Sequence, residues 1–361
     1  MKGLLASLFA GVLIIATSCT EKRVETPTCG FDVLSMQRSF HEAAILRLQQ
    51  VKDLQAVTLS KANKFNSNPT ADNLIALQEA SSEAYLAYQG IASLDIEGSY
   101  TKRSTNFFGN WLNGFPAGID SLDYRLNFGP TSMDAASELV AGYPAEDYVL
   151  YGFKGSFQER LSFYQNNDDA RFFLFKLVQF NLSFINEINT YWVSQLGEFH
   201  SNTGTSNGDP LSLFVNAVIK DFEFLKNFKL KNPIGRFNAG NPRPEFAEAY
   251  YSQHSFELAY ENYKRVKEWI VGETQEVKVP LINYVNCIDQ NTANSIRAQF
   301  QVVDALWEEL EPFGEGMFIE PAPQETTNKI INEMQKLTPL LKAEMTSKLN
   351  INITYQDNDG D

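Results

Sequence analysis

Histidine and cysteine are scarce in this chain, whose 361 residues include three of each. A zinc ribbon or a site with several histidine ligands cannot be assembled from so few of these side chains. Positive charge is also in short supply, because 30 lysine and arginine residues face 44 aspartate and glutamate residues, which gives a formal net charge of −14. Such a surface repels phosphate backbones and argues against a nucleic-acid partner. It suits cations or basic peptides, and equally it suits plain solubility.

Several catalytic signatures are missing as well. The sequence contains no Gly-x-Ser-x-Gly nucleophile elbow, no phosphate-binding P-loop and no dinucleotide-binding glycine fingerprint. His41 and Glu42 begin like the zinc motif His-Glu-x-x-His, but Ile45 stands at the position of the second histidine. One histidine cannot hold zinc, so we interpret His41 and Glu42 as a pair on the surface of a helix.

The first residues have the pattern of an export signal. Lys2 supplies a positive charge, and the apolar run from Leu4 to Ala16 is short for a membrane span, which takes about 20 residues. Small residues then precede Cys19, a pattern that resembles a lipoprotein signal. We therefore predict a signal peptide over residues 1–18, lipid modification of Cys19 and a tether over 19–30. An ordinary secretory signal with an incidental cysteine is the alternative.

Lipid modification of Cys19 would leave Cys29 and Cys287 as the remaining free cysteines. In an oxidising compartment these two thiols can pair and connect the N-terminal region to the distal half of the chain. Two buried free thiols are equally compatible with the sequence, which does not give the distance between them.

Helical periodicity dominates the chain, and strand signals are few. One segment repeats at three- and four-residue spacing after a candidate N-cap at Thr70: Leu74, Leu77, Ser81, Ala84, Tyr88 and Ile91. A single core stops growing near ~250–300 residues, so we predict an all-α fold of two helical bundles. We place the first in residues 31–165, including an irregular segment rich in glycine and proline, and the second in 166–361, which ends in a short extended tail.

Further helices are predicted in the second half of the chain. The segment from Arg171 to Ile188 is apolar but contains polar and basic residues, so we predict a bundle helix and not a membrane span. Other expected helices cover Leu211–Phe228, Pro244–Val271 with Gly272 at its end, 290–311 and 323–349, where Pro339 should break or kink the chain. His254 and Glu257 would lie one turn apart on one of these helices, either as metal ligands or as an ordinary hydrogen-bonded pair.

The most informative stretch runs from Gly142 to Gly152 and reads GYPAEDYVLYG. It resembles the signature of the imelysin family, Gly-x-His-x-x-Glu followed by an aromatic residue, two apolar residues, a second aromatic residue and glycine. Gly142 matches the first glycine and Tyr148–Gly152 match the end. Pro144 stands where the family has histidine, and Asp147 stands where it has glutamate.

Weaker similarities extend the resemblance over almost the whole chain, from about Phe31 to Asp361. They include Asn232–Gly235 with the following Glu248–Ser252, and the ending from Leu349 onwards. The resemblance implies an all-α protein of two four-helix-bundle-like halves, with the signature in a groove between them. It also implies export, often with a lipid anchor, and a link to iron uptake. Some members carry an insulin-cleaving peptidase assignment, with the histidine and glutamate of the signature as proposed metal ligands.

This sequence departs from the family at those two positions. Pro144 has no side-chain donor or acceptor, so it cannot ligate a metal, whereas Asp147 keeps a carboxylate. The remaining candidates for an iron or zinc site are Asp147, Glu146, His254 and Glu257. A metallopeptidase needs metal ligands, an activated water and a general base, and we find no such set here.

These observations lead to three hypotheses about function. The first is an exported, lipid-anchored, non-catalytic binding protein that faces the periplasm or the cell surface. A groove lined by residues 98–155 and 232–257 would hold a small ligand or a metal, and a partner protein of an uptake system would act with it. The second is an imelysin-type metallopeptidase whose ligands lie elsewhere. The third is a helical surface scaffold that docks a partner protein.

Lipid attachment at Cys19 gives the first testable prediction. A palmitate analogue supplied to growing cells should label the wild-type protein, because a run of small residues ends the apolar segment directly before this cysteine. Labelling of the Cys19→Ser variant should fall to background. Equal labelling of the two proteins would contradict the prediction.

Overall fold

The computed structural model describes residues 29–99, 107–129, 132–133, 137–272 and 276–355. Within these ranges the chain consists of helices and their connections, without a β-strand, which confirms the all-α prediction. Helix α1 (Val33–Ser67) and helix α2 (Ala71–Tyr88) form an antiparallel pair. Thr70 caps α2, as predicted, by accepting a hydrogen bond from the backbone N–H of Asn73.

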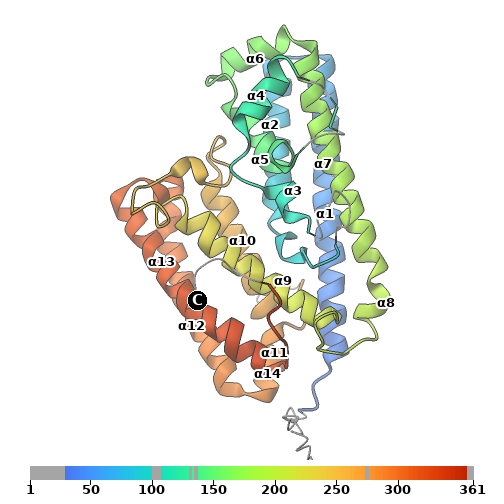
Figure 1. Cartoon of the computed structure of the whole chain (residues 1–361), viewed down its shortest axis with the longest axis vertical. Helices are drawn as coiled ribbons and strands as arrows, with labels where there is room; N and C mark the ends of the chain where they lie inside the picture. Colours follow the sequence, from blue (N-terminus) through green and yellow to red (C-terminus); the bar gives the residue numbers. More distant parts are fainter. Residues whose placement is uncertain (1–28, 100–106, 130–131, 134–136, 273–275, 356–361) are drawn as a thin grey trace, which may run out of the picture.

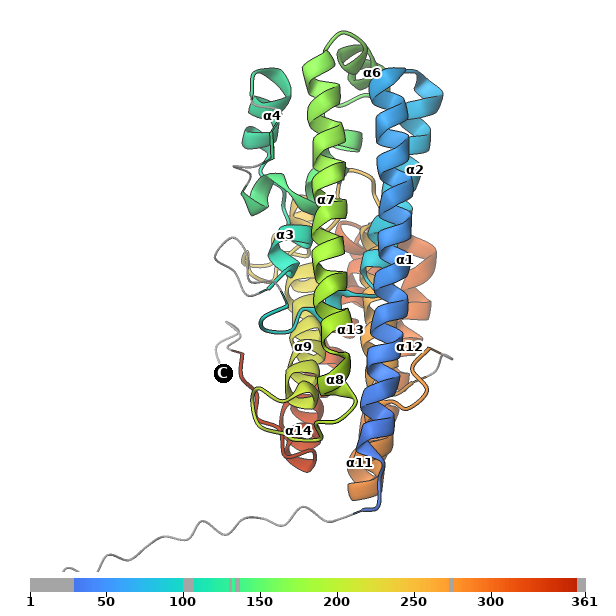
Figure 2. The ribbon, with the colours of Figure 1, turned by 90° about the vertical axis from the view of Figure 1, so that its right-hand side faces the viewer.

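A third long helix, α7 (Asp168–Ser194), packs along α1 and completes the first group of helices (Figures 1 and 2). The short elements between α2 and α7 are η1 (Ala92–Leu94), α3 (Gly109–Asn113), α4 (Ile119–Asn127), η2 (Glu138–Val140), α5 (Gly142–Asp147), the π-helical η3 (Tyr148–Gly152) and α6 (Phe157–Gln165). The division of the chain near residue 165 stays a prediction. Helix α7, which follows it, contacts α1, α4, α5 and α6.

The second group follows α8 (Leu196–Phe199), and its helices α9 and α10 lie between the first group and the α12–α13 pair (Figure 1). Its elements are α9 (Pro210–Phe224), the π-helical η4 (Leu225–Lys231), η5 (Pro244–Phe246), α10 (Ser255–Ile270), α11 (Leu281–Ile288), α12 (Gln290–Leu310), η6 (Glu311–Phe318), α13 (Pro321–Pro339), the π-helical η7 (Leu340–Met345) and α14 (Thr346–Lys348). None of the helices in the described ranges is long and apolar enough to cross a membrane.

The two groups share one continuous core. Phe40 of α1 stacks on Phe214 of α9 with ring centroids 4.7 Å apart, and the Trp269 ring of α10 meets the Phe214 ring edge-on at 5.0 Å. All three side chains are fully buried. Next to them Arg47 of α1 forms a buried ion pair with Glu268 of α10, and its guanidinium lies 4.3 Å from the Trp269 ring centroid. The interface between the groups therefore combines aromatic packing with buried charge.

Two helix predictions need correction. The helix expected over 244–271 begins at Ser255 instead, because Ala249 (φ 52°) and Gln253 (φ 60°) adopt left-handed backbone conformations that a helix does not tolerate. Gly272, at φ 75°, follows the end of that helix as expected. Pro339 does not break the last helix. The chain stays helical through it and passes into the π-helical η7, and a kink at this residue stays a prediction.

The ends of the described chain are held against the second group. Cys29 and Cys287 form a disulfide, with a Cα–Cα distance of 5.7 Å, which resolves the alternative left open by the sequence. Residues 351–355 are extended, as predicted, and lie along α9. There Asn216 donates a hydrogen bond to the carbonyl of Asn352 (2.9 Å) and accepts one from the backbone N–H of Thr354 (2.8 Å).

His41 is not the surface residue that the sequence suggested. Its side chain is only 4% exposed, and its Nε2 lies 2.8 Å from the carbonyl oxygen of Trp192. The ring also packs 5.6 Å from the ring of Phe199. Glu42 next to it is exposed, so the surface-pair interpretation is wrong for His41 and holds for its neighbour.

Candidate functional site

The segment Gly142–Gly152, which we call the motif turn, is buried from Gly142 to Leu150 in the middle of the molecule. Gly142 has φ 79°, and a Cβ added to it would lie 2.6 Å from the carbonyl oxygens of both Trp111 and Leu112. Only glycine fits such a backbone conformation and such a close approach. Pro144 follows in the first turn of α5, where a helix leaves its backbone N–H groups without partners in any case. The local sequence therefore suits a tight turn that opens directly into a helix.

Glu146 points into the first group of helices. Its carboxylate is fully buried and accepts hydrogen bonds from Gln55 of α1 (3.0 Å), Ser81 of α2 (2.7 Å) and Asn181 of α7 (2.7 Å). Burial raises the pKa of Glu146, and these three neutral donors act in the opposite direction. Asn181 also accepts a hydrogen bond from the backbone N–H of Gly142 (3.1 Å). Glu146 thus ties α5 to the three long helices around it.

Asp147 points the other way, toward the second group. Its two carboxylate oxygens accept the backbone N–H groups of Tyr251 and Ser252, each at 3.0 Å. The residue is 5% exposed, and burial raises its pKa to about 6, against the opposing effect of its hydrogen bonds and of nearby His254. In the structure Asp147 therefore holds two backbone amides of the segment before α10.

The four candidate metal ligands are only partly brought together. His254, directly before α10, lines a cavity of about 10 Å³ with Asp147, Ser81 and Tyr151, which has room for about one water molecule. Glu257 is exposed on the first turn of α10, and Glu146 faces α1, α2 and α7. No group of three or more His, Cys, Asp or Glu side chains in the described part of the chain is placed to hold a metal ion. The metal assignment of these residues stays a prediction.

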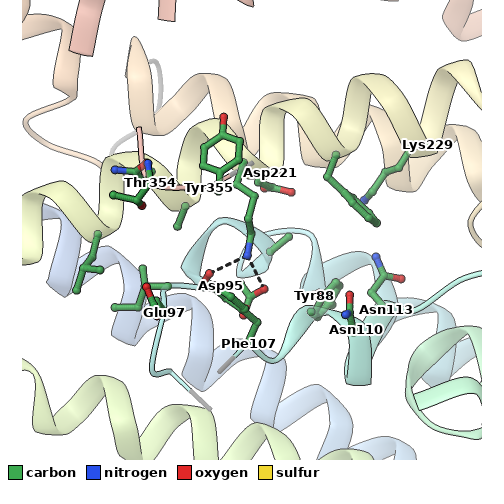
Figure 3. A pocket seen from close by; sticks show the side chains of 18 residues that line it. Tyr88, Asp95, Glu97, Phe107, Asn110, Asn113, Asp221, Lys229, Thr354 and Tyr355 are labelled. Carbon is green, nitrogen blue, oxygen red and sulfur yellow. Dashed lines mark hydrogen bonds and ion pairs between the residues drawn. The ribbon is translucent and has the colours of Figure 1, made fainter. Parts of the chain in front are cut away.

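A larger cavity of about 550 Å³ lies where the two groups of helices meet (Figure 3). We call it the junction cavity. Its walls come from residues 88–97 and 107–113, from α9 and η4, and from the C-terminal tail: Tyr88, Ala92, Asp95, Ile96, Glu97, Phe107, Gly109, Asn110, Asn113, Leu213, Asn216, Ala217, Lys220, Asp221, Phe224, Lys229, Thr354 and Tyr355. The expected contribution of 98–155 is present in part. Residues 232–257 do not line it, and α9 forms the other wall. Both expected segments do line the small cavity, through Asp147 and Tyr151 on one side and Ser252 and His254 on the other.

A buried ion pair links the junction cavity to the motif turn. Lys229 and Glu248 are each about 1% exposed and lie 2.9 Å apart. Glu248 also accepts hydrogen bonds from Gln89 (2.9 Å) and Asn113 (2.7 Å), and Asn113 accepts one from Tyr85 (2.6 Å). Asn113 lines the junction cavity and Tyr85 lines the small cavity beside Asp147. The two cavities therefore share one hydrogen-bonded wall.

Sequence reasoning missed these polar partners. A usable signal was present in α9 and η4, where Asp221, Glu223, Lys226 and Lys229 interrupt an otherwise apolar helical segment. Charged side chains on the apolar face of a buried helix are normally paired. Gln55 carries no such signal, because an amide on a long helix looks the same in sequence whether it faces solvent or a buried carboxylate.

The raised pKa of Asp147 predicts a pH-dependent stability. A carboxyl whose pKa rises from 3.8 to about 6 on folding favours the folded state most at low pH, and this contribution is lost as the pH rises through about 6. Urea unfolding of the wild type between pH 4 and pH 8 should therefore include a loss of up to about 3 kcal/mol from this group.

The Asp147→Asn variant isolates that contribution, because it removes the titration and keeps the shape. Glu315, whose pKa burial raises to about 7, acts in the same direction and remains in both proteins, so the difference between the two profiles reports Asp147 alone. If the free energy of unfolding depends on pH in the same way for the wild type and the variant, the prediction is contradicted.

Comparisons with known proteins agree with this fold. A crystal structure of an imelysin-like protein from Psychrobacter arcticum superposes with a TM-score of 0.64 at 13% sequence identity, covering 90% of this chain and 99% of that one. A protein from Parabacteroides distasonis described as an iron-regulated protein A precursor has a TM-score of 0.67 at 13% identity, covering 88% and 95% of the two chains. A search of curated proteins finds no match. The family model described as Imelysin matches residues 46–342, so the chain belongs to the imelysin family.

Proposed function

We propose that this protein is an exported, lipid-anchored and non-catalytic member of its family that binds a small ligand in the junction cavity. The observation that carries the proposal is the contrast between two sites. The carboxylates of the motif turn are committed to hydrogen bonds within the protein, whereas a cavity of about 550 Å³ with charged and aromatic walls lies one hydrogen-bonded wall away. Small-molecule sites usually have volumes of 300–1,000 Å³ and occur where two structural units meet.

The residues of the motif turn do not fit a resident metal ion. Pro144 offers no ligand atom, and both oxygens of Asp147 already accept backbone N–H groups. Glu146 accepts three hydrogen bonds inside the first group of helices. Binding a metal would require these carboxylates to give up partners that hold the fold together, so we derive no metal-dependent step at this place.

A link to iron or nutrient uptake is the physiological part of the proposal. The structural relative from Parabacteroides distasonis is described as an iron-regulated protein A precursor, and the word precursor fits an exported protein. Residues 1–28, including Cys19, lie outside the described residues, and the sequence pattern there supports a lipid anchor. We infer that the protein faces the periplasm or the cell surface and delivers its ligand to a partner protein of an uptake system.

Metal content and proteolysis test the non-catalytic part of the proposal. Mature protein purified from its host and dialysed should contain far less than one equivalent of iron or zinc, because a single imidazole, that of His254, lies beside Asp147 and the motif turn itself supplies neither imidazole nor thiolate. It should also leave denatured peptide substrates intact. Stoichiometric metal that is lost in the His254→Ala variant, or cleavage of the peptides, would contradict the proposal and favour a metallopeptidase.

The binding part is tested on the same preparation. Mass spectrometry of the supernatant after the protein is denatured should reveal a small molecule released in stoichiometric amount. A protein that releases none, and that binds no member of a broad metabolite panel, would contradict a binding role.

A further inference from the structure

Asp221 is the one buried acid on the wall of the junction cavity that keeps a carboxylate oxygen without a hydrogen-bond donor among the described residues. It is 5% exposed and sits on α9. Ser93 (2.5 Å) and Asn262 (2.9 Å) both donate to Oδ2, and no described residue donates to Oδ1. Since the residue lines the cavity, its second oxygen is available to a molecule inside (Figure 3).

The basic residues of the wall are already engaged by other acids. Lys220 donates to the side chain of Asp95 (3.0 Å), and its ammonium lies 3.8 Å from the centroid of the Phe107 ring. Lys229 is paired with Glu248 at 2.9 Å. Lys220 and Lys229 are therefore each paired with another acid, and the carboxylate of Asp221 forms no direct ion pair with either of them.

The pKa of the Asp221 carboxyl reflects its burial and its distance from the two lysines. Burial raises its pKa, and the more distant charges of Lys229 and Lys220 only partly oppose that rise. A cation placed beside Oδ1 would stabilise the ionised carboxylate. Glu97, exposed at the edge of the cavity, adds a further negative charge to the region.

Aromatic rings complete the surroundings. Tyr88, Phe107, Phe224 and Tyr355 line the junction cavity together with Asp221 (Figure 3). The faces of such rings attract cations and also bury apolar carbon, which is how proteins recognise ammonium groups. A metal ion is a poorer occupant, because hard cations need several oxygen ligands and no three acids in the described residues are placed to supply them.

We propose that the junction cavity takes a small organic monocation, a primary amine in its protonated form, whose ammonium group donates to Oδ1 of Asp221 and whose carbon skeleton packs against the aromatic rings. This inference rests on the proposed binding function and names the chemical class of its ligand. No covalent step is involved.

Three probes of matched size test the charge requirement: phenethylamine, phenethyl alcohol and phenylacetate. Calorimetric titration of the mature protein should give measurable binding of the amine. The neutral alcohol should bind about 10-fold more weakly or worse, because it can donate a hydrogen bond to the carboxylate but forms no ion pair with it. The anion should bind least, because it would meet an acid in excess.

Variants then locate the interaction. Asp221→Asn keeps an oxygen that accepts from Ser93 and Asn262, and it should weaken amine binding about 10-fold while the affinity for the alcohol changes little. Glu223→Gln removes another buried acid of α9 that does not line the cavity, and it should leave both affinities unchanged. Phe224→Leu keeps apolar volume without the ring face and should weaken the amine several-fold. Thermal unfolding of each variant checks that it is folded.

The outcomes separate this inference from the proposed function. Phenylacetate binding as tightly as phenethylamine, or an anion as the molecule released from the native protein, would overturn the inference and leave a binding role intact. A ligand that is absent from the native protein, together with no binding of any probe, would contradict both. If the Asp221→Asn variant is unfolded, two other results test the inference. These are the order of the affinities of the three probes for the wild type and the affinity of the Phe224→Leu variant for phenethylamine.

Discussion

The structure depends on satisfying two adjacent buried carboxylates that have no basic residue as a direct hydrogen-bond partner. Burying such groups without partners would cost several kcal/mol each, so every donor around them has a structural role. Glu146 receives its donors from α1, α2 and α7, and Asp147 receives two backbone N–H groups from the segment that precedes α10. Because successive side chains of a helix lie about 100° apart around its axis, Glu146 and Asp147 face different groups of helices, and this one turn connects the two groups.

This arrangement explains how a departure from the family signature is tolerated. Proline at position 144 fits the first turn of α5, and aspartate at position 147 reaches the backbone of Tyr251 and Ser252 with its short side chain. The Lys229–Glu248 pair continues the polar wall toward the junction cavity through Asn113. The motif turn thus borders the hydrogen-bonded wall of the junction cavity, and in the proposed binding function Asp221 of α9 sets the chemistry of the ligand.

The sequence was sufficient for the helical class, the Thr70 cap and the family, because each depends on local periodicity or on a contiguous motif. It was not sufficient for features that depend on contacts across the chain. The start of α10 at Ser255 follows from left-handed residues that the pattern does not encode, and the burial of His41 follows from its contact with Trp192. The cavity wall was missed for the same reason, since Asp221 and Ser93 meet only after folding.

Hydrogen exchange at the backbone amides of Tyr251 and Ser252 tests most directly whether Asp147 holds the two groups of helices together. Both amides donate to its carboxylate in the structure. Mass-spectrometric exchange of the wild type and of an Asp147→Ala variant should show these amides protected in the first protein and exchanging at least about 10-fold faster in the second, because a lost hydrogen bond to a charged group corresponds to about 1.5–3 kcal/mol. Unchanged protection at Tyr251 and Ser252 in the variant would contradict the account.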